Sequence, residues 1–122
     1  PITGIHVWGS WLNDIPNLQT TFHLSIHDDV PVDPTTAYSH PGNLLWQMDF
    51  APGSYTARIW GQAQEMFYDP NTDQIIGSDT RVVQYNFPVP QAAAFVQQGT
   101  QSAPKVYWLD VQALVPGDQV AI

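Results

Sequence analysis

Apolar and polar residues alternate one by one along several short segments of this chain. The clearest alternation is that of Phe22, Leu24 and Ile26 with the polar side chains between them. Because successive side chains of a β-strand point to opposite faces, such a segment is predicted to be a strand with one face in the core. The pattern also predicts a first strand over residues 4–12 and a final strand over residues 118–122. The same period of two recurs over residues 44–50, 55–59, 83–87 and 107–113.

Proline and glycine mark the chain reversals between these segments. Pro41-Gly42, Pro52-Gly53 and Pro116-Gly117 each suit the central positions of a type II turn, so a turn is predicted at each. Residues 28–42 contain three prolines without alternation and are expected to form a long surface loop. Residues 91–98 contain three consecutive alanines and are predicted to form one short helix.

Together these elements indicate a single all-β domain over residues 1–122. The expected architecture is one antiparallel, jelly-roll-like β-sandwich. No apolar run approaches the roughly 20 residues of a membrane helix, so membrane insertion is not expected. The chain begins at Pro1 without a leader segment, which is typical of a processed or excised chain.

The charge of the chain is sparse and negative in balance. Three Lys and Arg residues against 11 Asp and Glu residues give a net charge of −8. Nucleic acid is held by clustered basic residues, whereas Arg58, Arg81 and Lys105 are far apart in sequence, so nucleic acid is excluded as a partner. The absence of cysteine excludes disulfides and thiol chemistry. A single lysine and a single glutamate are typical of an extracellular surface.

No residue pattern indicates catalysis. None of the serines lies in a G-x-S-x-G frame. Glu65 is the sole glutamate, and no spacing pairs it with an aspartate as a glycosidase requires. The chain is therefore predicted not to be an enzyme.

Two acidic groups are candidate calcium sites. Asp69, Asn71 and Asp73 follow the D-x-N-x-D spacing that places oxygen ligands at alternate positions of a calcium loop, and Asp28 and Asp29 form a second group. The alternative is that these residues cap backbone groups of turns, because the glycine and the closing glutamate of an EF-hand loop are missing. Calcium is thus a possible cofactor, and no other is expected.

Three histidines, His6, His23 and His27, are candidate ligands of a transition metal. His23 and His27 lie four residues apart on one strand, about 13 Å, which is too far for both to bind one ion. A site would therefore need ligands from several strands. The alternative is that these residues are polar side chains on the solvent face of a strand.

Aromatic residues are the clearest candidates for ligand binding. Trp60, Trp108, Trp8 and Tyr38 offer flat rings on which a neutral, sugar-like ligand can stack. Trp60 and Trp108 are predicted to lie on the outer face of a sheet. The alternative is that the tryptophans fill the core or cover its ends.

Several sequence blocks resemble an uncharacterised family of domains found in secreted bacterial proteins. The resemblance implies export and a β-rich, jelly-roll-like sandwich, without an established activity. It extends over nearly the whole chain and rests on the blocks IHVWGSWLNDIP at 5–16, FHLSIHDDVP at 22–31, YSHPG at 38–42, YDP at 68–70, QYNF at 84–87 and VYWLDV at 106–111.

The resemblance also implies a missing strand, because domains of that family continue with a further tryptophan-containing strand. A sandwich that lacks a strand exposes an edge that a neighbour can fill by strand addition. Residues 1–12 or 118–122 are the expected donors. The predicted function is a non-catalytic, extracellular structural or adhesive module that binds copies of itself or other matrix components. The alternative is a module that binds polysaccharide.

Overall fold

The computed structural model describes residues 1–117, so the strand predicted over residues 118–122 lies outside the described residues. The described chain contains two three-residue 3₁₀ turns, η1 (Leu12–Asp14) and η2 (Gln91–Ala93). It also contains six strands, which are β1 (Gly4–Gly9), β2 (Thr21–Val30), β3 (His40–Phe50), β4 (Thr56–Asp69), β5 (Gln74–Pro88) and β6 (Tyr107–Leu114).

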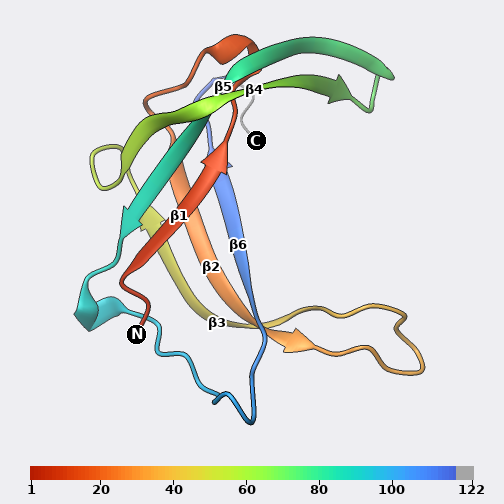
Figure 1. The fold of residues 1–122 in the computed structure, drawn as a ribbon, viewed down its shortest axis with the longest axis vertical. Coiled ribbons are helices and arrows are strands. Elements are labelled where there is room, and N and C mark those ends of the chain that lie inside the picture. Colours follow the sequence, from red (N-terminus) through yellow and green to blue (C-terminus); the bar gives the residue numbers. More distant parts are fainter. Residues whose placement is uncertain (118–122) are drawn as a thin grey trace.

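The six strands form two antiparallel three-stranded sheets that face each other (Figure 1). Their orders are β1-β5-β4 and β3-β2-β6. The predicted all-β fold and antiparallel sandwich are therefore confirmed. A full jelly roll has eight strands, whereas residues 1–117 supply six.

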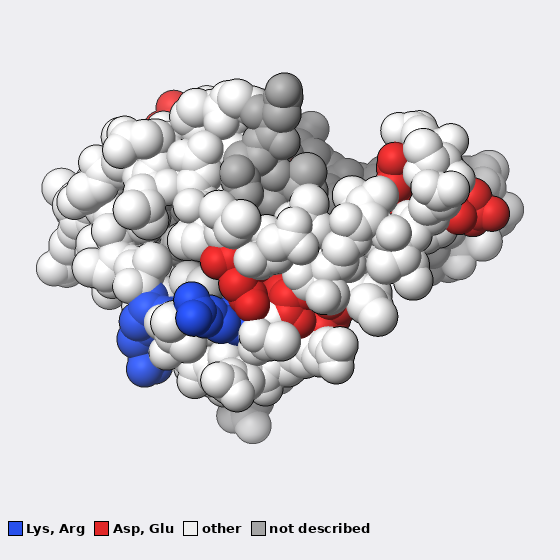
Figure 2. All heavy atoms as spheres, turned by 90° about the horizontal axis from the view of Figure 1, so that it is seen from above, with Lys and Arg blue, Asp and Glu red and all other residues white. Residues whose placement is uncertain are grey.

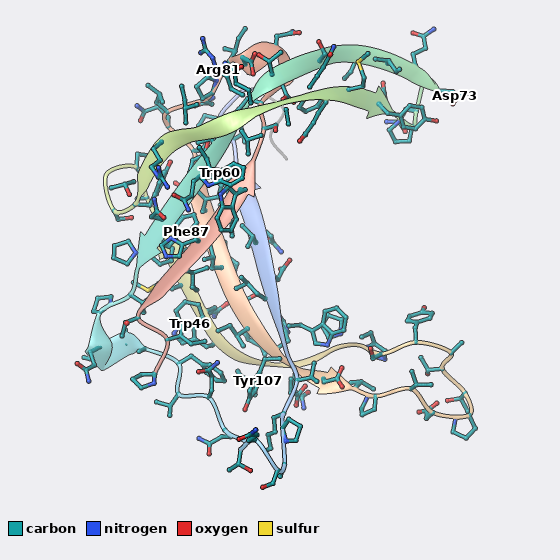
Figure 3. The ribbon with its side chains drawn as sticks, viewed as in Figure 1. Trp46, Trp60, Asp73, Arg81, Phe87 and Tyr107 are labelled. Atoms are coloured by element: carbon teal, nitrogen blue, oxygen red, sulfur yellow. The ribbon has the colours of Figure 1, made fainter. Side chains whose placement is uncertain are left out.

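The core between the sheets is mainly aromatic. Phe22 in β2 contacts Tyr85 and Phe87 in β5, with ring centroids 4.9 and 5.3 Å apart. Phe50 in β3 packs on Phe87 at 5.0 Å. Figure 3 shows Phe87 in the middle of this arrangement. The predicted alternation in β2 is confirmed, because its inward side chains are buried: Phe22, Leu24 and Ile26.

The chain turns inward after β1, so the strand predicted over residues 4–12 is too long. Trp11 is buried and donates a hydrogen bond from Nε1 to the hydroxyl of Tyr85 at 2.6 Å. This inward turn ends the strand at Gly9 and leads into η1. The η1 turn then packs closely on β5, where Leu12 leaves no room for a side chain at Gly77.

Asp14 attaches η1 to β5. Its carboxylate accepts hydrogen bonds from the backbone N–H groups of Thr80 and Arg81 at 2.9–3.1 Å. Burial acts to raise the pKa of Asp14, but these hydrogen bonds and the charge of Arg81 outweigh it and lower the pKa. The register of the β4–β5 ladder shifts at the same level, between Gln62 and Glu65. Asp14 therefore satisfies backbone donors where the ladder is interrupted.

Two of the predicted turns and the short helical segment are present. Gly53 and Gly117 both have positive φ, at 93° and 75°. The helix predicted over residues 91–98 is limited to η2, after which the chain is extended. Pro90 precedes this turn, and Trp46 in β3 donates a hydrogen bond to the carbonyl of Ala93 at 2.8 Å.

The turn predicted at Pro41-Gly42 is wrong, because both residues lie in β3. The loop predicted over residues 28–42 is consequently shorter and spans residues 31–39. The reason lies in the packing across the strands: Asp28 Oδ1 accepts the N–H of Asn43 at 2.5 Å. A Cβ on Gly42 would lie 2.3 Å from that oxygen, so the glycine makes room for a cross-strand contact and not for a turn.

The hairpin of β4 and β5 is longer than the sandwich. Residues 66–78, which we call the arm, arch over the top of the molecule and project beyond β6 in Figure 1. The arm carries large apolar side chains that are exposed, namely Met66, Tyr68, Ile75 and Ile76.

Candidate functional site

Two tryptophans meet on the outer face of the sheet β1-β5-β4. The ring centroids of Trp8 and Trp60 are 6.2 Å apart, with the planes at 75°. Trp8 points outward because Val7, its neighbour in β1, faces Tyr85 in the core. Trp60 lies at a register shift of β4, and Figure 3 shows its ring in front of the sheet near the end of β1. Both side chains are half exposed, at 51% and 57%.

Polar side chains flank this aromatic pair. Gln84 in β5 lies between Trp8 of β1 and Arg58 of β4 in the strand register, and Arg58 Nε donates to Gln84 Oε1 at 2.6 Å. His6 and Asn86, the next outward pair along the same two strands, are hydrogen bonded through Nδ1 and Oδ1. We call these six residues the aromatic face. Flat rings beside amide and guanidinium groups can bind a neutral ligand that is rich in hydroxyl groups.

The polar members Arg58, Gln84 and Asn86 were not among the residues predicted from sequence. Only strand pairing brings them beside Trp8, because β1 lies more than 40 residues away from both partner strands. The alternation around residues 83–87 did indicate that Gln84 and Asn86 point outward, but it could not show which strands lie beside them.

The other two aromatic candidates lie elsewhere. Trp108 belongs to β6 in the opposite sheet, where it is half-buried and donates from Nε1 to Asp29 Oδ1 at 2.9 Å. Tyr38 lies in the loop between β2 and β3 and is exposed. The calcium candidates Asp28 and Asp29 are therefore engaged by Asn43 and Trp108, respectively.

The third acidic group closes the tip of the arm. Asp69 accepts the backbone N–H of Asn71 at 2.9 Å and the hydroxyl of Thr72 at 3.1 Å. The hydroxyl of Tyr68 donates to Asp73 Oδ1 at 2.5 Å, and this hydrogen bond raises the pKa of Tyr68. These contacts are those of a capped turn. Within residues 1–117, no group of three or more His, Asp or Glu side chains is arranged to hold a metal ion.

The structure does not bring the three candidate histidines together. His6 lies in β1 of one sheet, whereas His23 and His27 lie in β2 of the other. His23 Nδ1 contacts Asp49 Oδ1 at 2.5 Å, and His27 contacts the Ser25 hydroxyl at 3.0 Å. Each histidine thus has its own polar partner.

The sandwich is open along the side where strands β1 and β6 form the edges of the two sheets. A hollow of about 360 Å³ lies there. Its walls include inward residues of the two edge strands and its floor includes core residues, among them Val7, Gly9, Val111, Ala113, Phe22 and Tyr85. We call this hollow with β6 the open side.

The inward side chains of β6 remain exposed at the open side. Leu109 and Val111 are paired with Ile26 and Leu24 of β2, so all four point toward the opposite sheet. Ile26 and Leu24 are 4% and 0% exposed, whereas Leu109 and Val111 are 46% and 37% exposed. The opposite sheet therefore covers β2 but leaves β6 uncovered.

Comparison with known proteins places the chain in a family without giving it an activity. No curated protein and no solved structure matches the chain. Among the described residues, no helix is long and apolar enough to cross a membrane. One family matches residues 1–121, in agreement with the resemblance to an uncharacterised family. By this match the chain belongs to the family described as a domain of unknown function (DUF7901).

Proposed function

We propose that this domain is a non-catalytic structural module that assembles with further copies of itself through its open side. The observation that carries the proposal is the exposure of Leu109 and Val111 on the inward face of an edge strand. Edge strands with exposed apolar side chains are templates for strand addition. We further propose the location that the composition indicates, outside the cell at its surface or in its matrix.

The arm supplies the surface that we propose to fit the open side of the next copy. It projects from the sandwich and exposes apolar side chains, among them Met66 and Ile75, at 60% and 62%. The arm and the open side are different surfaces of one chain, so contact between them is heterologous. Such contacts close into a ring or continue as a fibre. Residues 1–12 are not the donor in this proposal, because β1 is paired with β5 of its own chain.

Cysteine cross-linking tests this arrangement, because the natural chain has no cysteine. The double variant Leu109→Cys, Ile75→Cys is expected to form a ladder of disulfide-linked oligomers on oxidation. The single variant Leu109→Cys is expected to stop at the dimer. A matched control replaces Ile75→Cys by Leu18→Cys, an exposed position before β2, and is expected to give no ladder.

Light scattering of the natural chain over a concentration series provides the second readout. The proposal predicts that the mean mass rises with concentration and that Leu109→Asp with Val111→Asp lowers it to that of the monomer. A monodisperse monomer at every concentration, together with no ladder, contradicts the proposal.

Carbohydrate binding is the second candidate function, and the pairing of Trp8 with Trp60 favours it. Two half-exposed indoles beside Arg58 and Gln84 form a continuous surface that suits a polysaccharide. Electrophoresis through gels that contain soluble polysaccharides tests this function. Retardation is expected to be lost in Trp8→Ala and Trp60→Ala and kept in Trp108→Ala. Retardation that is equal in all three variants contradicts a site at the aromatic face.

A further inference from the structure

A carboxyl group is buried without a hydrogen bond where the arm leaves the sandwich. Asp79 in β5 is 1% exposed, and neither of its carboxylate oxygens has a hydrogen-bond partner. An unpaired buried carboxylate is costly, and nearly all buried polar groups in folded proteins are satisfied. This side chain therefore indicates a partner from outside the chain.

Oxygen atoms of two other residues lie beside Asp79. Glu65 is its direct partner across the β4–β5 ladder, which places both carboxylates on one face of the hairpin. The buried hydroxyl of Ser10, just after β1, donates its hydrogen bond to Glu65 Oε2 at 3.2 Å. Three strands thus bring oxygen ligands to one place.

The electrostatics of this place favour a cation. Burial raises the pKa of Asp79, and the negative charges of Glu65 and Asp14 raise it further. Asp14 has its own donors in Thr80 and Arg81. Figure 2 shows acidic side chains beside basic ones on the top of the molecule, but no basic side chain hydrogen-bonds to Asp79 within residues 1–117.

We propose that the carboxylates of Asp79 and Glu65, together with the hydroxyl of Ser10, bind one Ca²⁺ ion. The two carboxylates match its charge, and calcium prefers carboxylate, hydroxyl, carbonyl and water oxygens in flexible sets of six to eight. Since three acidic side chains do not converge here, water completes the set and Asp14 remains outside it. The ion would fasten the end of β1 to the base of the arm.

Calcium titration of the metal-free protein tests the proposal independently of assembly and of carbohydrate binding. The expected results are binding heat in calorimetry and a melting temperature that rises by roughly 5 °C or more at calcium concentrations far above Kd. Mg²⁺ is expected to give a smaller rise, because it requires a stricter octahedral geometry.

Variants with nearly unchanged shape locate the ion. Asp79→Asn and Glu65→Gln are each expected to abolish the calcium-induced rise, and Ser10→Ala to weaken it. The matched controls Asp69→Asn and Asp73→Asn, at the tip of the arm, are expected to keep the full rise. Should Asp79→Asn not fold, Glu65→Gln decides the question, because Glu65 lies at the surface.

Terbium luminescence adds a readout that folding stability does not affect. Tb³⁺ in the calcium site is expected to emit when tryptophan is excited, because Trp11 directly follows Ser10. The emission is expected to be lost in Glu65→Gln. The proposal is overturned if the natural chain shows neither binding heat nor a higher melting temperature with calcium. It is also overturned if the effect survives in Glu65→Gln and disappears in Asp73→Asn.

Discussion

The indole rings of Trp8 and Trp60 meet edge to face at 6.2 Å, although their strands β1 and β4 are not neighbours. Strand β5 lies between them, so the contact extends across the full width of the sheet. About half of each ring remains exposed. Contiguous apolar area of this kind on a surface marks an interaction site more often than it contributes to folding.

Trp60→Ala is therefore expected to change the free energy of unfolding by less than about 1 kcal/mol, whereas Trp11→Ala should cost about 3–5 kcal/mol. Trp11 is buried and donates its hydrogen bond to Tyr85, and neither condition holds for Trp60. Urea unfolding of both variants measures the difference. An equal loss in the two variants would show that the aromatic pair is a structural contact.

The fold could be predicted from sequence because its strands follow the simplest rule, one inward side chain in every two. Phe22, Leu24 and Ile26 are buried as that rule predicts. The rule is local, and it failed where a contact between distant residues decides the conformation. Pro41 and Gly42 have the composition of a turn, yet they continue a strand because Asp28 crosses to Asn43.

The candidate sites depended on strand order, which no local pattern contains. Sequence reasoning selected Trp8 and Trp60 as separate rings, and only the order β1-β5-β4 joins them. Asp79 and Glu65 face each other after two register shifts in β4, so counting along the sequence could not have paired them. The signal that was available was the isolation of Glu65, the sole glutamate in a chain with many aspartates.

Gly77→Ala is expected to destabilise the fold by about 1–3 kcal/mol, because the added methyl group overpacks the contact between η1 and β5. A Cβ at this position would lie 2.5 Å from Leu12 Cδ1 and 3.0 Å from Asn13 Oδ1. Thermal unfolding measures the loss. Gly61→Ala in β4 is the matched control, since its Cβ would meet nothing within 4 Å. Equal melting temperatures for the two variants would contradict the tight seat of η1.

Leu24→Ala is expected to cost about 2–5 kcal/mol of unfolding free energy in the monomer, and Val111→Ala less than about 1 kcal/mol. The two residues are neighbours across the β2–β6 ladder, but only Leu24 is fully buried. Denaturant unfolding at low concentration measures both. If the open side binds a second copy, the cost of Val111→Ala should grow with protein concentration. A large cost at every concentration would mean that β6 is already covered within the monomer.

Asp14→Asn tests the attachment of η1 through its dependence on pH. The folded-state pKa of Asp14 lies below its ordinary value of 3.8, so the ionised carboxylate stabilises the folded chain. This stabilisation is fully present above that value and is lost as the pH falls through the lower, folded-state pKa. The difference in melting temperature between the natural chain and Asp14→Asn should therefore be widest near neutral pH and should close toward about pH 2.

Asp33→Asn provides the comparison for this pH series. Hydrogen bonds from the Thr35 hydroxyl and from the backbone of Thr35 and Thr36 also lower the pKa of Asp33. The same acidic pH range applies, but Asp33 lies in the exposed loop between β2 and β3, so its effect on global unfolding should be smaller. A difference for Asp14→Asn that stays constant from neutral pH to pH 2 would mean that Asp14 acts through its shape, since only the charge is lost on protonation.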